Sequence, residues 1–143
     1  MKVSELPYKR VTLEEIKAVM DDVLARTLNA KSADEVLAAR EDYLRIYCEY
    51  STAGSLSYMR YSINTVDEFY VAEKDYYDEI GPEVENYNVQ YAGALLDSPF
   101  RAELEERLSP VLFKHLEVRR KAMSPEIIED LVEENKLISE YSK

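Results

Sequence analysis

The chain has 143 residues, enough for one domain whose buried core needs neither a disulfide nor a metal ion. Acidic residues outnumber basic ones by 29 to 18, and the resulting net charge of −11 excludes nucleic acid as an expected partner because the phosphate backbone would be repelled. The single cysteine, Cys48, excludes an internal disulfide and a cysteine-based zinc site.

The N-terminal segment Met1–Val11 carries Pro7 and mixed charges, and we expect it to be extended. It has no apolar run of the kind that a signal peptide requires. No stretch of the chain approaches 18 uncharged apolar residues, so no membrane span is predicted. We therefore expect a cytoplasmic protein with no membrane partner.

Thr12 is expected to open the first helix, because Thr12 and Glu15 have the spacing of a capping box. The helix is expected to end at Asn29, since asparagine tolerates the left-handed conformation that often follows a helix. Its apolar residues recur in steps of three and four, the period of a helical face. They are Leu13, Ile16, Met20, Val23, Leu24 and Leu28.

A second capping box, Ser32 with Glu35, predicts a long helix over Ala33–Ile63. Gly54 lies inside it and is expected to loosen or bend it, because glycine costs about 1 kcal/mol relative to alanine in a helix. The small residues around Gly54 would also let another helix approach closely. The predicted apolar face consists of Val36, Leu37, Tyr43, Leu44, Tyr47 and Cys48.

The stretch Thr65–Leu96 is expected to be a second long helix, opened by a capping box of Thr65 and Glu68. A turn at Asn64 would make it the antiparallel partner of the helix before it. Gly81–Pro82 interrupts this stretch, and a kink or a restart is expected there because proline lacks an amide hydrogen. The sequence thus predicts a long central hairpin, bent near Gly81–Pro82.

Three Ser-Pro pairs predict three further helices, with serine as the cap and proline in the first helical position. The expected helices are Pro99–Leu108, Pro110–Lys121 and Pro125–Tyr141. No segment has the alternating pattern of a strand. The fold class is therefore predicted to be all-α, with about six helices in antiparallel hairpins, and residues 1–143 are expected to form a single domain.

The last predicted helix has a strong apolar stripe and runs almost to Lys143 without a terminating signal. We therefore expect the chain to be a fragment of a longer protein. As a fragment it would expose apolar surface, and a homodimer through its last helix is the predicted consequence.

Residues that could carry out chemistry are few. His115 is the only histidine, and it cannot form a His-Glu-x-x-His zinc motif or the Glu-x-x-His pairs of a di-iron site. The three glycines, Gly54, Gly81 and Gly93, form no phosphate-binding loop. We expect His115 to be a surface or half-buried helix residue and Cys48 to be a small core residue. No catalytic, cofactor-binding or metal-binding residue is predicted in the chain.

Two groups of side chains each have two interpretations. Glu73, Asp75, Asp78 and Glu79 could bind calcium or a basic peptide, but they lack the loop spacing of a calcium site, and a solvated helix face is favoured. Of the twelve tyrosines, those at helical spacing are expected to pack in the core: Tyr70, Tyr77, Tyr87 and Tyr91. The others, including Tyr50, Tyr58, Tyr61 and Tyr76, either do the same or line a groove that holds peptide backbone.

Several segments resemble the N-terminal region of the oligoendopeptidase F family of thimet-like zinc metallo-oligopeptidases. They are the Ser4–Tyr8 opening, the Arg60–Glu73 run (RYSINTVDEFYVAE), Leu95–Arg101 (LLDSPFR) and Ser124–Leu137 (SPEIIEDLVEENKL). The order of the segments also fits, and the resemblance spans essentially the whole chain.

The resemblance implies a helical, cytoplasmic peptidase that cuts short peptides in a channel between two halves. Zinc would be held by a His-Glu-x-x-His helix and a later glutamate, and none of these positions falls in this chain. The chain would form part of the channel wall or lid, with the catalytic domain of the same protein and an oligopeptide as partners. The alternatives are a stand-alone acidic helical module that binds a protein or peptide, and a small enzyme built on His115.

Overall fold

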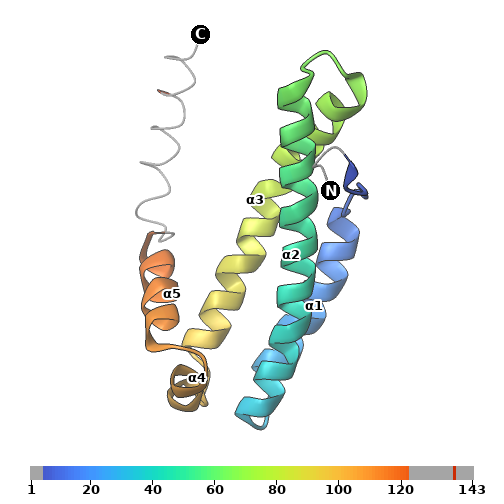
Figure 1. Cartoon of the computed structure of the whole chain (residues 1–143). Helices are drawn as coiled ribbons and strands as arrows, with labels where there is room; N and C mark the ends of the chain where they lie inside the picture. Colours follow the sequence, from blue (N-terminus) through green and yellow to red (C-terminus); the bar gives the residue numbers. More distant parts are fainter. Residues whose placement is uncertain (1–4, 123–136, 138–143) are drawn as a thin grey trace. The chain divides into compact units, whose positions relative to one another are not determined.

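The computed structural model describes residues 5–122 and Leu137 (Figure 1). All regular elements in this part of the chain are helices, so the all-α prediction is confirmed. They are α1 (Leu13–Leu28), α2 (Ala33–Ile63), α3 (Glu68–Leu96), α4 (Arg101–Arg107) and α5 (Pro110–Ala122). Within the described residues, no helix is both long enough and apolar enough to cross a bilayer. The sixth predicted helix, Pro125–Tyr141, and the dimer expected through it lie outside the described residues.

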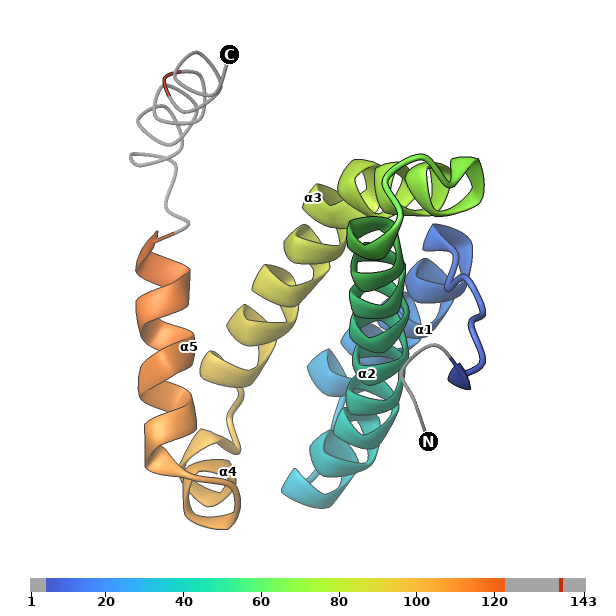
Figure 2. The same ribbon diagram turned by 45° about the horizontal axis from the view of Figure 1, so that its top comes forward.

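The chain divides into two compact units, residues 1–88 and 89–143. In the first unit, side-chain pairs give the directions of the helices (Figure 2). Partners in α2 and α3 run in opposite order along the two helices, which makes the two antiparallel as predicted: Arg60 with Tyr70 and Tyr43 with Asn88. Between α1 and α3, Lys17 pairs with Glu83 and Asp21 pairs with Tyr87. The residue numbers increase in the same direction along both helices, so α1 and α3 run parallel.

The first capping box forms as predicted. The Thr12 hydroxyl accepts a hydrogen bond from the Glu15 amide at 3.3 Å, and the Glu15 carboxylate accepts one from the Thr12 amide at 2.9 Å. The second forms only in part. The Ser32 hydroxyl accepts from the Glu35 amide, but the Glu35 carboxylate accepts from the Lys31 amide at 2.7 Å. In both cases a glutamate carboxylate accepts a hydrogen bond from a backbone amide at the helix start that has no partner within the helix.

Two predictions about helix ends are wrong in detail. The long helix α3 begins at Glu68 and not at Thr65, because the Asp67 carboxylate accepts hydrogen bonds from the amides of Phe69 (3.0 Å) and Tyr70 (3.3 Å). Asn29 does end α1, but its φ of −98° is not left-handed. Its side-chain amide instead donates to the Ala25 carbonyl at 2.8 Å, which satisfies one of the carbonyls left over at the helix end.

The helix α3 continues through Gly81–Pro82 without interruption, so a restart at Pro82 does not occur. Proline removes one amide donor from the ladder, and the hydrogen bonds of the adjacent turns are sufficient to keep the segment helical. The predicted bend at this point stays a prediction.

The buried face of α2 differs from the predicted one. Val36, Ala39 and Ile46 are buried, whereas Leu44, Tyr47 and Cys48 are exposed. Since α2 packs against α1 and its side chains also meet those of α3, its contact positions favour small residues that allow close approach. The core of the first unit consists of Val11, Ile16, Met20, Val23, Ala33, Val36, Ala39, Ile46, Ala53, Leu56, Tyr77, Ile80 and Val84.

In the second unit, α5 begins at Pro110 as predicted, and the Ser109 hydroxyl accepts a hydrogen bond from the Val111 amide at 3.1 Å. The helix α4 begins two residues later than expected, at Arg101, and no side chain caps its amides. Arg101 joins α4 to α5 through an ion pair with Glu117 at 2.6 Å. Leu104 of α4 and Phe113 of α5 are both buried, and the Arg101 guanidinium lies 5.7 Å from the centre of the Phe113 ring.

The close approach at Gly54 leads to a first prediction. A methyl group on Gly54 would lie 3.6 Å from the Tyr77 ring, an ordinary packing distance, and Gly54 has a helical backbone. Gly54→Ala should therefore raise the free energy of unfolding by about 0.5–1 kcal/mol in urea titrations. Gly93→Ala is the matched control, because nothing lies within 4 Å of its added methyl group. Stabilisation by the control alone would show that the Tyr77 ring approaches too closely.

Candidate functional site

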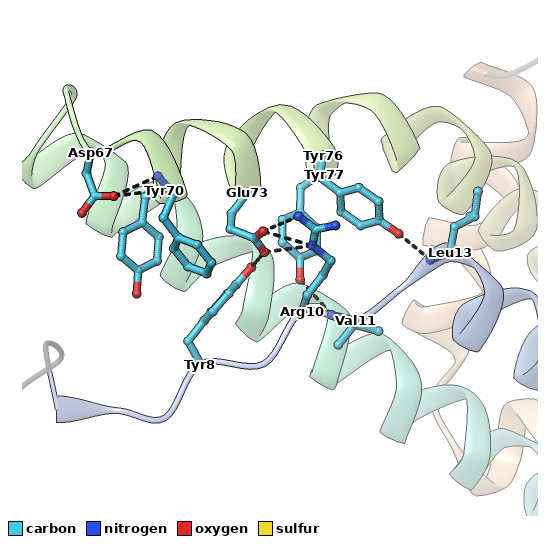
Figure 3. Close-up of polar contacts among 10 residues, drawn as sticks. Tyr8, Arg10, Val11, Leu13, Asp67, Tyr70, Glu73, Tyr76 and Tyr77 are labelled. Carbon is cyan, nitrogen blue, oxygen red and sulfur yellow. Dashed lines mark hydrogen bonds and ion pairs between the residues drawn. The ribbon is translucent and has the colours of Figure 1, made fainter.

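The N-terminal segment is bound to α3 by a buried carboxylate (Figure 3). Glu73 is only 4% exposed, and its side chain receives three donors. Arg10 donates from Nε to both carboxylate oxygens, at 3.1 and 3.0 Å, and from its Nη2 to Oε1; the Tyr8 hydroxyl donates to Oε2. The guanidinium also lies over the Tyr76 ring, 4.2 Å from its centre. Of the segment predicted to be extended, Tyr8 and Arg10 are thus held against α3 by a charge-assisted cluster.

Two adjacent tyrosines of α3 accept hydrogen bonds from the backbone that enters α1. The Val11 amide donates to the Tyr77 hydroxyl at 3.0 Å, and the Leu13 amide donates to the Tyr76 hydroxyl at 2.9 Å. Both amides precede the hydrogen-bonded turns of α1 and have no partner within the helix. The tyrosine side chains therefore replace water at the point where α1 meets α3 (Figure 3).

The cluster lowers the pKa of the Glu73 carboxyl and raises the pKa of the Tyr8 hydroxyl. Hydrogen bonds from Arg10 hold the pKa of Glu73 below its ordinary value, with the Tyr8 hydroxyl acting in the same sense and burial acting against both. Burial raises the pKa of Tyr8 far above its ordinary value, and the hydrogen bond to Glu73 adds to this. The arrangement therefore holds a carboxylate and a neutral phenol over the whole neutral range.

The predicted solvated acidic face is wrong for one member. Asp75, Asp78 and Glu79 are exposed, and Lys74 pairs with Asp78 at 2.5 Å, as a solvated helix face requires. Glu73 instead points inward, because the N-terminal segment supplies its partner Arg10 from 63 residues away. No local sequence signal contains that information, although an arginine two residues after a tyrosine in an extended segment is a hint of it.

The surplus tyrosines occupy different surroundings. Tyr76 takes part in the contact with α1, and the Tyr50 ring packs 5.8 Å from that of Tyr77. Tyr61 lies beside the Lys74 ammonium, and Tyr58 is exposed. Of the tyrosines expected in the core, Tyr77 and Tyr91 are buried, while Tyr70 and Tyr87 are partly exposed. The peptide-binding groove stays a prediction.

Cys48 and His115 are both on the surface. This confirms the interpretation of His115 and corrects that of Cys48, which lies roughly opposite the buried Ala39, Ile46 and Ala53 on α2. Cys48 borders an open cavity of about 530 Å³ between the N-terminal segment and α2. Its apolar floor includes Val11, Ala53 and Leu56, and its rim carries Lys9, Glu15 and Glu49.

Within residues 5–122, no group of three or more histidine, cysteine, aspartate or glutamate side chains is placed to hold a metal ion. A protein zinc site needs at least three such ligands close together, and the described residues do not provide them. The prediction that the chain holds no catalytic, cofactor-binding or metal-binding residue remains a prediction.

Comparison with known proteins gives consistent matches. Residues 3–123 match the family described as the peptidase M3 N-terminal domain. A solved structure of PZ peptidase A with an inhibitor is 39% identical, with a TM-score of 0.85 over 99% of this chain. A crystal structure named "putative Oligoendopeptidase F" is 40% identical, with a TM-score of 0.84 over 100% of this chain.

The matched region is only a part of each of those proteins. The chain corresponds to 25% of the length of each solved structure. No curated protein matches the chain.

The buried carboxylate gives a prediction with a defined pH dependence. Glu73→Gln leaves Arg10 and Tyr8 without their charged partner and should lower the free energy of unfolding at pH 7 by about 2 kcal/mol. Because the folded pKa of Glu73 is depressed, its contribution is present above the unfolded value of about 4.3 and is lost as pH falls through the folded pKa. Urea titrations at pH 7 and at pH 3 should therefore show the difference between wild type and variant shrinking in acid.

Glu83→Gln is the matched control, since Glu83 lies on the same helix in an exposed pair with Lys17. It should cost less than about 1 kcal/mol. Equal effects of the two substitutions would contradict the role assigned to Glu73.

The tyrosine contacts give a third prediction. Tyr77→Phe removes only the hydroxyl that accepts from the buried Val11 amide, and should cost about 1–2 kcal/mol of unfolding free energy. Tyr87→Phe removes a hydroxyl that donates to Asp21 at an exposed position and should cost less than about 0.5 kcal/mol. A hydrogen-exchange measurement should also show faster exchange of the Val11 amide in Tyr77→Phe alone; unchanged protection there would contradict the assignment.

Proposed function

The chain belongs to the peptidase M3 N-terminal domain family, and on this premise we propose that it is the N-terminal helical part of a zinc-dependent oligoendopeptidase that hydrolyses short peptides in the cytoplasm. The observation that carries the proposal is the match of essentially the whole chain to two solved structures, one of a peptidase and one named for an oligoendopeptidase. At 39–40% identity, the likeness extends beyond the fold to the side chains.

The proposed role of this segment is structural. Zinc and the groups that activate water would lie in the part of the polypeptide that corresponds to the other three quarters of the solved neighbours. This segment would form part of the wall or lid of the substrate channel. The cluster at Glu73 supports that role, because Arg10 and Glu73 fix the N-terminal segment to α3, and the neighbouring Tyr76 joins the start of α1 to the same helix.

A second candidate function is a stand-alone acidic helical module that binds a protein or peptide. The open cavity beside Cys48 favours it, because an apolar floor with a charged rim is typical of binding grooves. The two functions differ in whether the gene encodes a catalytic domain beyond Lys143 and in whether a second polypeptide is needed.

The proposal predicts a division of activity. The chain of residues 1–143 should not hydrolyse fluorogenic oligopeptides, whereas the natural polypeptide read from the gene beyond Lys143 should do so. A chelator should remove that activity and added zinc should restore it, because the metal supplies the activated water. A stop codon directly after Lys143, or hydrolysis that a chelator leaves unchanged, would contradict the proposal.

A further inference from the structure

Five exposed large hydrophobic side chains fall within residues 58–69, which form the turn between α2 and α3 and the adjoining ends of the two helices. Figure 1 shows the backbone of this turn. We call this group the hairpin tip. It consists of Tyr58, Met59, Ile63, Val66 and Phe69. Ile63 is 79% exposed and Val66 is 82% exposed. Soluble proteins seldom leave such a group uncovered, and exposed apolar patches mark interaction surfaces.

The hairpin tip also differs in charge from the rest of the protein. Residues 50–66 contain no aspartate or glutamate, although 29 of the 143 residues are acidic; within the span of the tip the acidic residues are Asp67 and Glu68, just before Phe69. A surface that is covered on assembly must not bury unpaired carboxylates, because the desolvation of a lone charge is costly. This stretch meets that condition in a chain whose net charge of −11 would oppose most contacts.

Three charged residues lie within the span of the tip, and two of them are already engaged within the chain. Arg60 donates to the Tyr70 hydroxyl at 2.7 Å and to the Leu6 carbonyl at 2.5 Å. The Asp67 carboxylate caps α3, and the Asp67 amide donates to the Asn64 carbonyl at 3.2 Å. Glu68, the third, is exposed. The tip is therefore pre-formed, and covering it would leave neither Arg60 nor Asp67 without a partner.

We propose that the hairpin tip is the surface on which the remaining part of the same polypeptide docks through apolar side chains. The proposal rests on the proposed function, because it takes the chain to correspond to a quarter of a longer protein. The solved neighbours have three quarters of their length outside the matched region, which provides an occupant that is always present. An occupant in the same polypeptide also overcomes the repulsion that two copies of this acidic chain would meet.

The test measures whether the tip is accessible in the natural polypeptide. Ile63→Cys and Val66→Cys are made singly in a Cys48→Ser background, because Cys48 is exposed and would react. Leu28→Cys is the matched control, since Leu28 is 71% exposed and lies at the far end of α1. Maleimide labelling is followed by mass spectrometry of the peptides that contain each position.

We expect both tip cysteines to react about tenfold more slowly than the cysteine at position 28, because a covered thiol reacts only when the contact opens. Equal rates at the three positions would overturn the proposal. Protection that appears only on raising the protein concentration would overturn it in favour of a second copy. Protection that appears only after an oligopeptide is added would overturn it in favour of bound peptide.

Peptide hydrolysis is measured on the same preparations, which separates the two proposals. A polypeptide that protects the tip but hydrolyses no peptide overturns the proposed function and leaves the docking surface in place. An active, chelator-sensitive peptidase whose tip cysteines react as fast as the control overturns the docking surface alone.

Discussion

The hydrogen bonds between Glu73 and the N-terminal segment are the contact on which the first unit depends. A carboxylate that is almost fully buried is stable only when donors surround it, and Arg10 and Tyr8 are its donors. Because these residues precede α1 and Glu73 lies in the first half of α3, the cluster joins the start of the chain to a distant segment. The tyrosine hydroxyls of Tyr76 and Tyr77 then fix the entry into α1.

The long helices also depend on contacts with one another. The helix α2 has small residues at its contact positions, such as Ala39 and Gly54. It is only weakly amphipathic. Helices of this kind are held by their neighbours on two sides. The parallel pair α1 and α3 and the antiparallel α2 provide those neighbours. The hydrogen bonds of Tyr76 and Tyr77 to the backbone that enters α1 fix the register between α1 and α3.

The supporting role proposed for this segment agrees with the surroundings of its ionisable side chains. In the described residues the buried carboxylate of Glu73 is fully engaged by its donors, and the exposed His115 and Cys48 stand on different helices without a catalytic partner assigned to either. The surface divides between an acidic majority and the apolar hairpin tip. A wall segment in a larger peptidase would need this combination, with a rigid interior, a solvated exterior and one surface for the rest of the polypeptide.

The sequence alone determined the helical class, the bounds of α2, the starts of α1 and α5, and the antiparallel turn near Asn64, because caps and prolines act over a few residues. Its resemblance to oligoendopeptidases also agreed with the family match. Only the tertiary structure decided which residues are buried. Glu73 lies inside because Arg10 comes from a distant segment, and Cys48 lies outside because the phase of α2 is set by two neighbours. Burial follows from contacts between distant residues, and the periodicity of one helix does not contain them.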